Sequence, residues 1–181
     1  MNIWHDINPA RISTVKFDAV VEIPLGSKLK YELDKETGLL RLDRVLYTST
    51  HYPSNYGFIP LTLAEDGDPL DVLMLSDEKF QPLSLIPSRP IGVIHMVDGG
   101  DRDEKIIAVA TGDPNYNGYH SIQELPSHIF DEMIHFFTIY KQLEGKQSTA
   151  KGIGDVEEAT DIIRVSIEKY HDLFDKKTSL I

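Results

Sequence analysis

The sequence predicts an α+β fold with a mainly β core, and two changes of pattern indicate this class. Between residues 17 and 110, short segments rich in β-branched and apolar residues alternate with turn residues, a pattern that favours a small barrel of short strands. From residue 127 onward, the apolar residues recur instead at helical spacing. A length of 181 residues suits one domain with its own core, so we expect residues 1–181 to form a single domain.

The strands are expected in chain order from these local patterns. Residues 18–23 are rich in β-branched and apolar side chains, and residues 29–33 and 39–43 flank the turn 34–38 as a hairpin. Further strands are expected at residues 70–75, 90–97 and 105–111. The acidic segment 98–103 joins the last two, and its residues alone indicate a solvated hairpin turn.

Two helices are expected in the final third of the chain. The first covers residues 127–143 and stops at Gly145, because its apolar side chains lie at helical spacing: Ile129, Phe130, Met133, Ile134, Phe137, Tyr140 and Leu143. Asp155 and Glu158 form an Asp-x-x-Glu cap for a last helix that reaches about Phe174. Residues 145–154 contain three glycines and few apolar residues, which predicts a loop.

Composition excludes several classes of protein. A formal net charge of −11 argues against a nucleic-acid partner, because such binding relies on a basic surface. No apolar run is long enough to span a membrane, and the first residues lack the pattern of a signal peptide. The absence of cysteine excludes disulfides and zinc–thiolate sites, and the seven histidines form no His-Glu-x-x-His motif. We therefore expect a cytoplasmic protein.

The segment 66–72 is the most informative stretch of the chain. It places Asp66, Asp68 and Asp71 within six positions, ahead of an apolar run. Hard divalent cations prefer oxygen ligands, so this spacing predicts a magnesium site. A calcium loop of the helix-loop-helix type would need Gly at its sixth position and Glu at its twelfth, where this chain has Asp71 and Asp77. The alternative is an ordinary acidic surface turn, in which Asp71 would open a buried strand at a cost.

The segment 66–72 and six further blocks resemble the family I (soluble) inorganic pyrophosphatases of the short bacterial type. The resemblance covers about residues 15–145, and the blocks follow in the family's order: 21–24 (Val-Glu-Ile-Pro), 30–32 (Lys-Tyr-Glu), 42–44 (Leu-Asp-Arg), 52–57 (Tyr-Pro-Ser-Asn-Tyr-Gly), 89–93 (Arg-Pro-Ile-Gly-Val) and 135–141 (His-Phe-Phe-Thr-Ile-Tyr-Lys).

This resemblance implies a fold, a reaction and an assembly. The fold is a five-stranded OB-type β-barrel flanked by two C-terminal helices. The reaction is the magnesium-dependent hydrolysis of inorganic pyrophosphate to two phosphates, by direct attack of a metal-activated water and without a covalent intermediate. The assembly is a homo-oligomer, a hexamer in relatives of this length. Several bound cations would explain how so acidic a chain accepts a polyanionic substrate.

The resemblance also implies the ligands of the metal. The positions of Asp66, Asp71 and Asp103 hold the tightest cation, and Asp71 bridges to a second. Asp98 and Asp103 bind a magnesium that arrives with the substrate. Glu32 serves another cation, although its own pattern on the strand indicates a solvated face. Glu22, by the same resemblance, accepts hydrogen bonds from water bound to the metal.

The catalytic and substrate-binding residues implied by the resemblance surround these carboxylates. Asp68 is the general base that accepts a proton from water. The phosphate contacts come from cationic side chains and from two tyrosine hydroxyls, while Tyr140 also fits the apolar face of its helix: Lys30, Arg44, Tyr56, Lys105, Tyr140 and Lys141. Arg grips phosphate with a two-pronged fork, whereas Lys acts as a movable point charge.

Two departures from the family pattern limit this comparison. Many relatives have Glu after the position of Asp98, where this chain has Gly99, so we expect weaker metal binding there. The segment after Lys141 lacks the Trp-containing stretch of many bacterial members, and no functional residue is assigned beyond it.

Two rival functions have weaker support. A nucleic-acid-binding OB module is opposed by the net charge of −11. A metal-stabilised structural protein with an inactive site is opposed by the combination of Asp68, Lys30 and Arg44, because scaffolding needs neither a base nor phosphate clamps.

Overall fold

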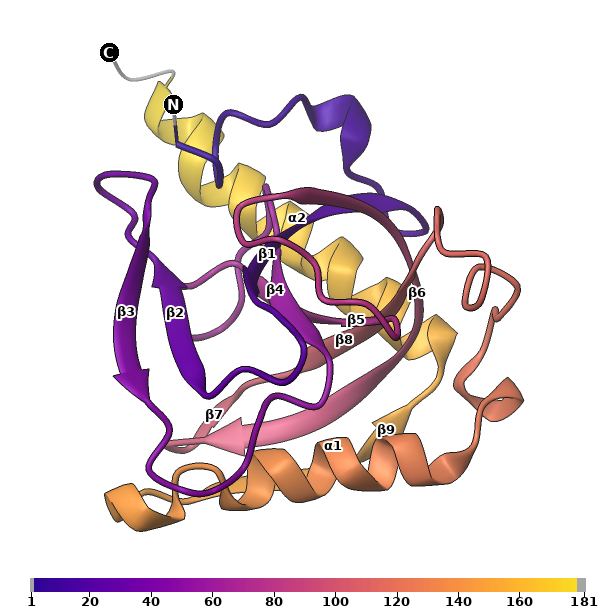
Figure 1. Ribbon diagram of the computed structural model, residues 1–181. Coiled ribbons are helices and arrows are strands. Elements are labelled where there is room, and N and C mark those ends of the chain that lie inside the picture. The colour runs from indigo at the N-terminus through magenta and orange to yellow at the C-terminus, as the bar shows by residue number, and fades with distance from the viewer. Residues whose placement is uncertain (1, 179–181) are drawn as a thin grey trace.

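Five strands form a closed ring in the computed structural model, which describes residues 2–178 and side chains as far as Phe174 (Figure 1). They are β1 (Phe17–Ile23), β4 (Asn55–Ile59), β5 (Leu70–Leu75), β6 (Leu85–Asp98) and β8 (Lys105–Ala110). The hydrogen-bonded order is β1-β4-β5-β8-β6, and β6 pairs again with β1. Within this ring β5 and β8 are parallel and the other pairs are antiparallel. The closed ring confirms the predicted five-stranded OB-type core.

The remaining elements surround this ring. A separate hairpin of β2 (Leu29–Leu33) and β3 (Leu40–Val45) stands at the left of Figure 1, while β7 (Asp101–Arg102) and β9 (Ser148–Gly154) pair with β6. Helix α1 (Ser127–Ile139) crosses the bottom of the view, and α2 (Val156–Thr178) runs diagonally along the ring. Three short 3₁₀ helices complete the fold: η1 (Pro9–Arg11), η2 (Ile122–Glu124) and η3 (Gln142–Glu144).

Strand β5 illustrates why these sequences form strands buried on both faces. Leu70, Val72 and Met74 pack in one apolar cluster, together with side chains from α2. Leu73 and Leu75 point the other way, into a cluster completed by α1. Side chains alternate between the two faces of a strand, so an uninterrupted apolar run is what a strand covered on both sides requires.

Gly57 allows β4 to lie close to β1. A Cβ atom at this position would stand 1.8 Å from the carbonyl oxygen of Val20, so no larger residue fits without backbone movement. This close approach brings Tyr56, the neighbour of Gly57, against the register partner Ile23 at the end of β1. The glycine therefore helps to position a tyrosine of the predicted site.

Both predicted helices are present, and their ends follow local chemistry. The Asp155 carboxylate accepts hydrogen bonds from the backbone N–H groups of Glu157 and Glu158 at 2.9 and 3.0 Å, which confirms the predicted cap of α2. Helix α1 ends at Ile139, earlier than expected, because the chain continues into η3. Leu143 is 69% exposed there and does not extend the apolar face of α1.

The expectation of a loop over residues 145–154 was wrong. Residues 148–154 form β9, which pairs antiparallel with β6 in a register that shifts between His95 and Met96. An edge strand with two glycines lacks the alternation by which strands are identified in sequence. Strand β4 and the first part of β6 were also not predicted as strands. In β6, Pro87 and Pro90 interrupt the usual pattern.

Among the described helices, none combines the length and the apolar character that crossing a membrane requires.

Candidate active site

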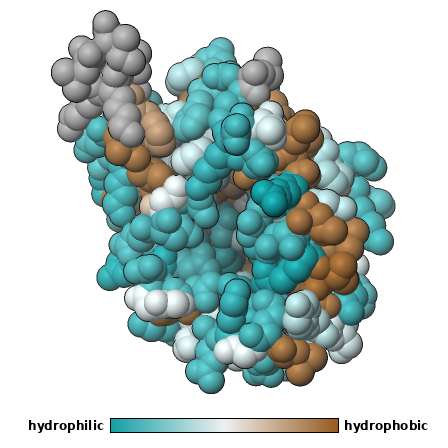
Figure 2. All heavy atoms as spheres, turned by 90° about the vertical axis from the view of Figure 1, so that its left-hand side faces the viewer, coloured by the Kyte–Doolittle hydropathy of each residue, from teal (hydrophilic) through white to brown (hydrophobic). Residues whose placement is uncertain are grey.

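A cavity of about 800 Å³ opens between the β2–β3 hairpin and the acidic loop that precedes β5. The face on this side of the molecule is largely hydrophilic and hollowed near its centre (Figure 2). Every predicted site residue except Arg44 lines the cavity: Glu22, Lys30, Glu32, Tyr56, Asp66, Asp68, Asp71, Asp98, Asp103, Lys105, Tyr140 and Lys141. The fold thus brings together residues from positions 22 to 141.

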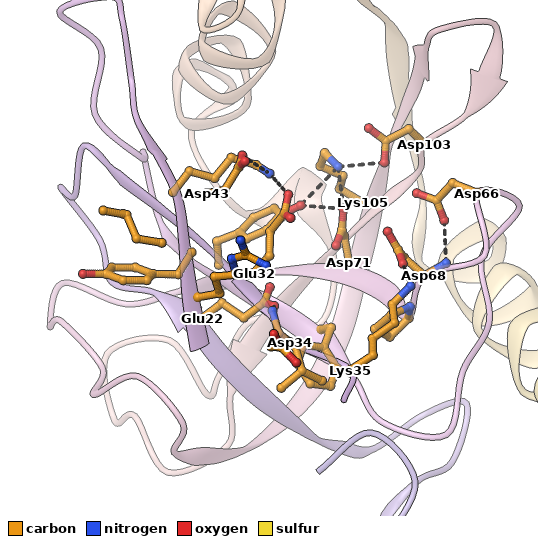
Figure 3. Close-up of a pocket in the computed structure, with 18 of the residues that line it drawn as sticks. Glu22, Glu32, Asp34, Lys35, Asp43, Asp66, Asp68, Asp71, Asp103 and Lys105 are labelled. Atoms are coloured by element: carbon orange, nitrogen blue, oxygen red, sulfur yellow. Dashed lines mark hydrogen bonds and ion pairs between the residues drawn. The ribbon is translucent and has the colours of Figure 1, made fainter. Parts of the chain in front are cut away.

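Asp71 and Lys105 meet because β5 and β8 are parallel. The two residues are register partners at the start of their strands, so both side chains lie at the same end of the ring. Nζ of Lys105 lies 2.6 Å from Oδ2 of Asp71 and 2.9 Å from Oδ1 of Asp103 (Figure 3). Burial opposes the charge on Lys105, but the two carboxylates outweigh it and raise the pKa of the ammonium well above its usual range.

Tyr56 also belongs to this buried group and lies on β4, which pairs with β5 on the side away from β8. Its hydroxyl donates a hydrogen bond of 2.5 Å to Oδ2 of Asp71, and Nζ of Lys105 lies 5.5 Å from the centre of its ring. Burial, followed by the Asp71 carboxylate, raises the pKa of Tyr56 well above 10. The tyrosine is therefore a neutral donor at physiological pH.

Glu22 is the most deeply buried carboxylate of the cavity, with 7% of its surface exposed. Its Oε1 accepts a hydrogen bond of 2.8 Å from the backbone N–H of Leu33, which connects β1 to the hairpin. Burial and the nearby Asp71 carboxylate raise the pKa of Glu22 to about 8. A cation in the cavity would favour the charged form of this group.

The acidic loop owes its shape to turn chemistry. Gly67 has φ of +86°, in the region that favours glycine, and Oδ1 of Asp66 accepts a hydrogen bond of 2.9 Å from the backbone N–H of Asp68. The loop is closed at its base where the Thr62 hydroxyl accepts a hydrogen bond of 2.9 Å from the backbone N–H of Leu70. Burial raises the pKa of Asp66. Asp68 points into the cavity at the exposed end of the loop, where it pairs with Lys35 (Figure 3).

The hairpin contributes alternating charges on one face. The Lys30 ammonium pairs with Glu32 and lies 3.2 Å from Oδ2 of Asp43. Burial opposes the charge on Lys30, but Glu32 and then Asp43 raise its pKa. Glu32 lines the cavity, and its side chain is also 58% exposed, as its pattern on the strand indicated.

Arg44 is not among the residues that line the cavity, and two acidic side chains hold it. Its Nε donates a hydrogen bond of 2.8 Å to Oε1 of Glu144, and its Nη1 pairs with Asp43. Its Nη2 is buried without a hydrogen-bond partner. Glu144 belongs to η3, beyond the last residue to which the sequence resemblance assigned a role. A buried donor without a partner is unusual, and this one would reach an oxygen of a ligand in the cavity only after the side chain moved.

Tyr140 and Lys141 reach the cavity from the end of α1. Tyr140 is 4% exposed and stacks on Phe136, so it is at once part of the core and part of the cavity lining. Lys141 pairs with Asp98 across the cavity. Next to Asp98, Gly99 has a φ of +59°, which suits the tight turn between β6 and β7, and no atom lies close to its Cβ position.

The described residues contain no preassembled cluster of three or more His, Asp or Glu side chains around a single point. Lysine ammonium groups stand between the carboxylates instead, as Lys105 does between Asp71 and Asp103. The side chains nevertheless suit a hard divalent cation, because the cavity offers carboxylate oxygens as metal ligands and none of its described lining residues is a histidine. The ligand roles of the individual aspartates remain predictions.

The cavity lining includes residues that the sequence did not indicate as part of the site, among them Lys35 and Asp43. Lys35 occupies the hairpin turn, and it belongs to the site only because it lies close to Asp68 in space. Asp43 was part of a family-like block, so its position beside Arg44 was a usable signal.

Comparisons with known proteins agree with the fold. The chain is 47% identical over 169 residues to "Soluble inorganic pyrophosphatase 2" of Chlamydomonas reinhardtii, covering 93% of this chain and 88% of that protein. The inorganic pyrophosphatase structure from Helicobacter pylori matches with a TM-score of 0.85 at 42% identity, over 88% of this chain and 95% of that one. The Thermus thermophilus enzyme matches with a TM-score of 0.89 at 36% identity, over 94% and 99%.

The fold and these relatives define a hydrolase of phosphoanhydride bonds, an inorganic diphosphatase. The family model for inorganic pyrophosphatase matches residues 19–171. The chain belongs to the inorganic pyrophosphatase family, whose members hydrolyse pyrophosphate and rely on a divalent metal cofactor.

Proposed function

We propose that this chain hydrolyses inorganic pyrophosphate to two phosphates with Mg²⁺ as its cofactor, by direct attack of water at the cavity described above. The observation that carries this proposal is the meeting of Asp66, Asp68 and Asp71 with Lys105 and Asp103 in one cavity. Acidic oxygens for a cation and basic groups for phosphate stand there within reach of a single small ligand.

The proposed cation ligands are carboxylates of the acidic loop, of β5 and of the β6–β8 connection. Asp66, Asp71 and Asp103 would hold the tightest cation, with Asp98 and Glu32 serving further ones and Glu22 accepting hydrogen bonds from water. Bound Mg²⁺ would neutralise charge on the phosphate groups and make water easier to deprotonate. The raised pKa values of Glu22 and Asp66 support this role, because carboxylates that burial disfavours gain most from a nearby cation.

The proposed reaction has one chemical step. The oxygen of a water molecule bonds to one phosphorus, the bridging P–O bond breaks, and the leaving phosphate keeps the bond electrons. Asp68 accepts the proton of the water, since it is an exposed acidic side chain of the loop and lines the cavity. No side-chain nucleophile is required.

The basic and hydroxyl groups of the cavity would hold the substrate. Lys30, Lys105 and Lys141 would contact phosphate oxygens as point charges. The uncommitted Nη2 of Arg44 supports its role as a further donor, although reaching the substrate requires that the side chain turn into the cavity. The hydroxyls of Tyr56 and Tyr140 would donate hydrogen bonds.

Two further proposals concern the setting of the enzyme. We infer a cytoplasmic location, supported by curated relatives that are named soluble pyrophosphatases. A homo-oligomer, a hexamer by the family resemblance, is the expected assembly, and analytical ultracentrifugation of the purified chain tests it.

Phosphate release from pyrophosphate tests the proposed function. Purified protein should release two phosphates per pyrophosphate with Mg²⁺ and none with excess chelator. A nucleoside triphosphate, offered at the same concentration, checks that the activity is specific for pyrophosphate. Equal release with chelator would remove the cofactor from the proposal.

A further inference from the structure

Lys35 joins the two sides of the cavity at its exposed end. It lies in the turn of the β2–β3 hairpin, and its ammonium pairs with the Asp68 carboxylate of the acidic loop. The same ammonium lies 3.5 Å from the carbonyl oxygen of Gly67, the residue before Asp68. Figure 3 shows the Lys35 side chain extending toward Asp68 from the hairpin.

An isolated ion pair at this exposure contributes little, because solvent screens it and both side chains lose freedom. The Lys35 and Asp68 side chains are 49% and 54% exposed. A third group changes this balance: the ammonium lies 5.4 Å from the centre of the Trp4 ring. A cation over a tryptophan face gains a further attraction, so Lys35 is held from two sides.

Trp4 is itself fixed to the acidic loop. It is 4% exposed, its indole N–H donates a hydrogen bond of 2.9 Å to the carbonyl oxygen of Thr62, and its own carbonyl accepts one of 3.1 Å from Leu61. Thr62 in turn closes the base of the loop at Leu70. The ring that holds Lys35 is thus anchored to the backbone that carries Asp66 and Asp68.

The N-terminal segment also binds the hairpin turn directly. The side-chain amide of Asn2 donates a hydrogen bond of 2.9 Å to the carbonyl oxygen of Lys35. The Trp4 ring also packs edge-on against Phe174 of α2, with ring centres 5.5 Å apart. Residues 2–4 therefore connect α2, the acidic loop and the hairpin turn at one point.

We propose that Lys35 is a positioning residue of the active site: its ammonium, held by the Trp4 ring, fixes one oxygen of Asp68 and leaves the other directed into the cavity. This inference rests on the proposed role of Asp68 as the base. A carboxylate at the tip of an exposed loop otherwise samples several rotamers, and only some of them suit proton transfer. Lys35 acts through Asp68 and does not bind the substrate.

Kinetics of five variants test this inference. Lys35→Met removes the charge but keeps the length of the side chain, Lys35→Arg keeps the charge, and Lys151→Met removes an exposed lysine that lies outside the cavity as a control. We expect Lys35→Met to lower kcat by about tenfold to a hundredfold, the usual effect of losing an orienting partner, with KM and Tm little changed. Lys35→Arg should restore most of the activity, and the control should match the parent.

The other two variants are Asp68→Asn alone and its combination with Lys35→Met. If Lys35 works through Asp68, Lys35→Met adds no further loss to the slow rate of Asp68→Asn, because the orientation that Lys35 maintained no longer matters. An equal further loss in the Asp68→Asn background, or a raised KM, would mean that Lys35 contacts the substrate and would overturn the proposal. Normal kcat in Lys35→Met would overturn it as well.

The emission of Trp4 checks the proposed contact independently, since Trp4 is the one tryptophan of the chain. Lys35→Met should change the fluorescence of metal-free protein, whereas Lys151→Met should not. Identical spectra for parent and Lys35→Met would contradict the contact. Activity of the parent with Mg²⁺ is measured first, so failure of the proposed function is seen separately from failure of this inference.

Discussion

Asp71 and Lys105 face each other across the parallel pair β5–β8, with Oδ2 and Nζ 2.6 Å apart. The Lys105 ammonium thus stands between the carboxylates of Asp71 and Asp103, two proposed cation ligands. If Asp71 and Asp103 bind the cation as proposed, metal binding should change this contact, because a divalent cation would compete with the ammonium for the same oxygens. The proposal therefore gives the charge of Asp71 a role in both the metal-free and the metal-bound forms.

Asp71→Asn should weaken Mg²⁺ binding and abolish most of the activity, since it removes a charge that two cations would share. Calorimetric titration with Mg²⁺ measures the binding, and phosphate release measures the activity. Asp101→Asn is the matched control, because Asp101 is exposed on the neighbouring hairpin and does not line the cavity. Parent-like Mg²⁺ affinity in Asp71→Asn would remove Asp71 from the ligands.

Calcium should support little turnover in place of magnesium. Mg²⁺ holds six ligands in a tight octahedron, which can direct water at the substrate, whereas the larger Ca²⁺ takes more ligands in a looser arrangement. Phosphate release at equal concentrations of the two ions provides the comparison. Similar rates with both would show that octahedral geometry is not what the reaction requires.

Glu22 should make the metal-free protein less stable as pH rises. Its unfolded pKa is 4.5 and its folded pKa is about 8, so between these values the folded chain holds a proton that the unfolded chain has lost. The free energy of unfolding therefore falls as pH increases through this window. Glu22→Gln cannot ionise, so its denaturant unfolding curves with chelator present should depend less on pH. A parent-like pH dependence in Glu22→Gln would assign the effect to another group.

Arg44→Lys should keep the charge but lose the fork that Glu144 and Asp43 now hold. We expect a several-fold increase in KM or decrease in kcat, with the fold intact by circular dichroism. Arg164→Lys, on the exposed side of α2, is the control. Unchanged kinetics would place Arg44 outside the site, in keeping with its absence from the cavity lining in this structure.

Local sequence signals predicted much of the fold because they act over short distances. The carboxylate of Asp155 caps α2 through neighbours two and three residues away. The hairpin over residues 29–43 likewise depends on its own turn. Strand β9 was missed because its pairing partners in β6 lie 50 to 61 residues away in the sequence, and its own composition is that of a loop. The closed order of the ring is non-local too, and it came from the family resemblance.

The site divides in the same way. Asp66, Asp68 and Asp71 were visible as one segment of the sequence. Lys35 and Glu144, by contrast, belong to the site only through partners that are 33 and 100 positions distant in the sequence, respectively. Neither has a residue type or spacing that distinguishes it from a surface charge. Contacts of this kind become visible only once the chain is folded.

The most direct test of the proposed chemistry is the turnover of Asp68→Asn at saturating Mg²⁺. Asn keeps the shape of the side chain but cannot accept the proton of water, so kcat should fall by about two to four orders of magnitude, the usual contribution of a positioned base. Mg²⁺ affinity, measured on the same sample, should change much less than in Asp71→Asn. Near-normal turnover of Asp68→Asn would contradict the assignment of Asp68 as the base.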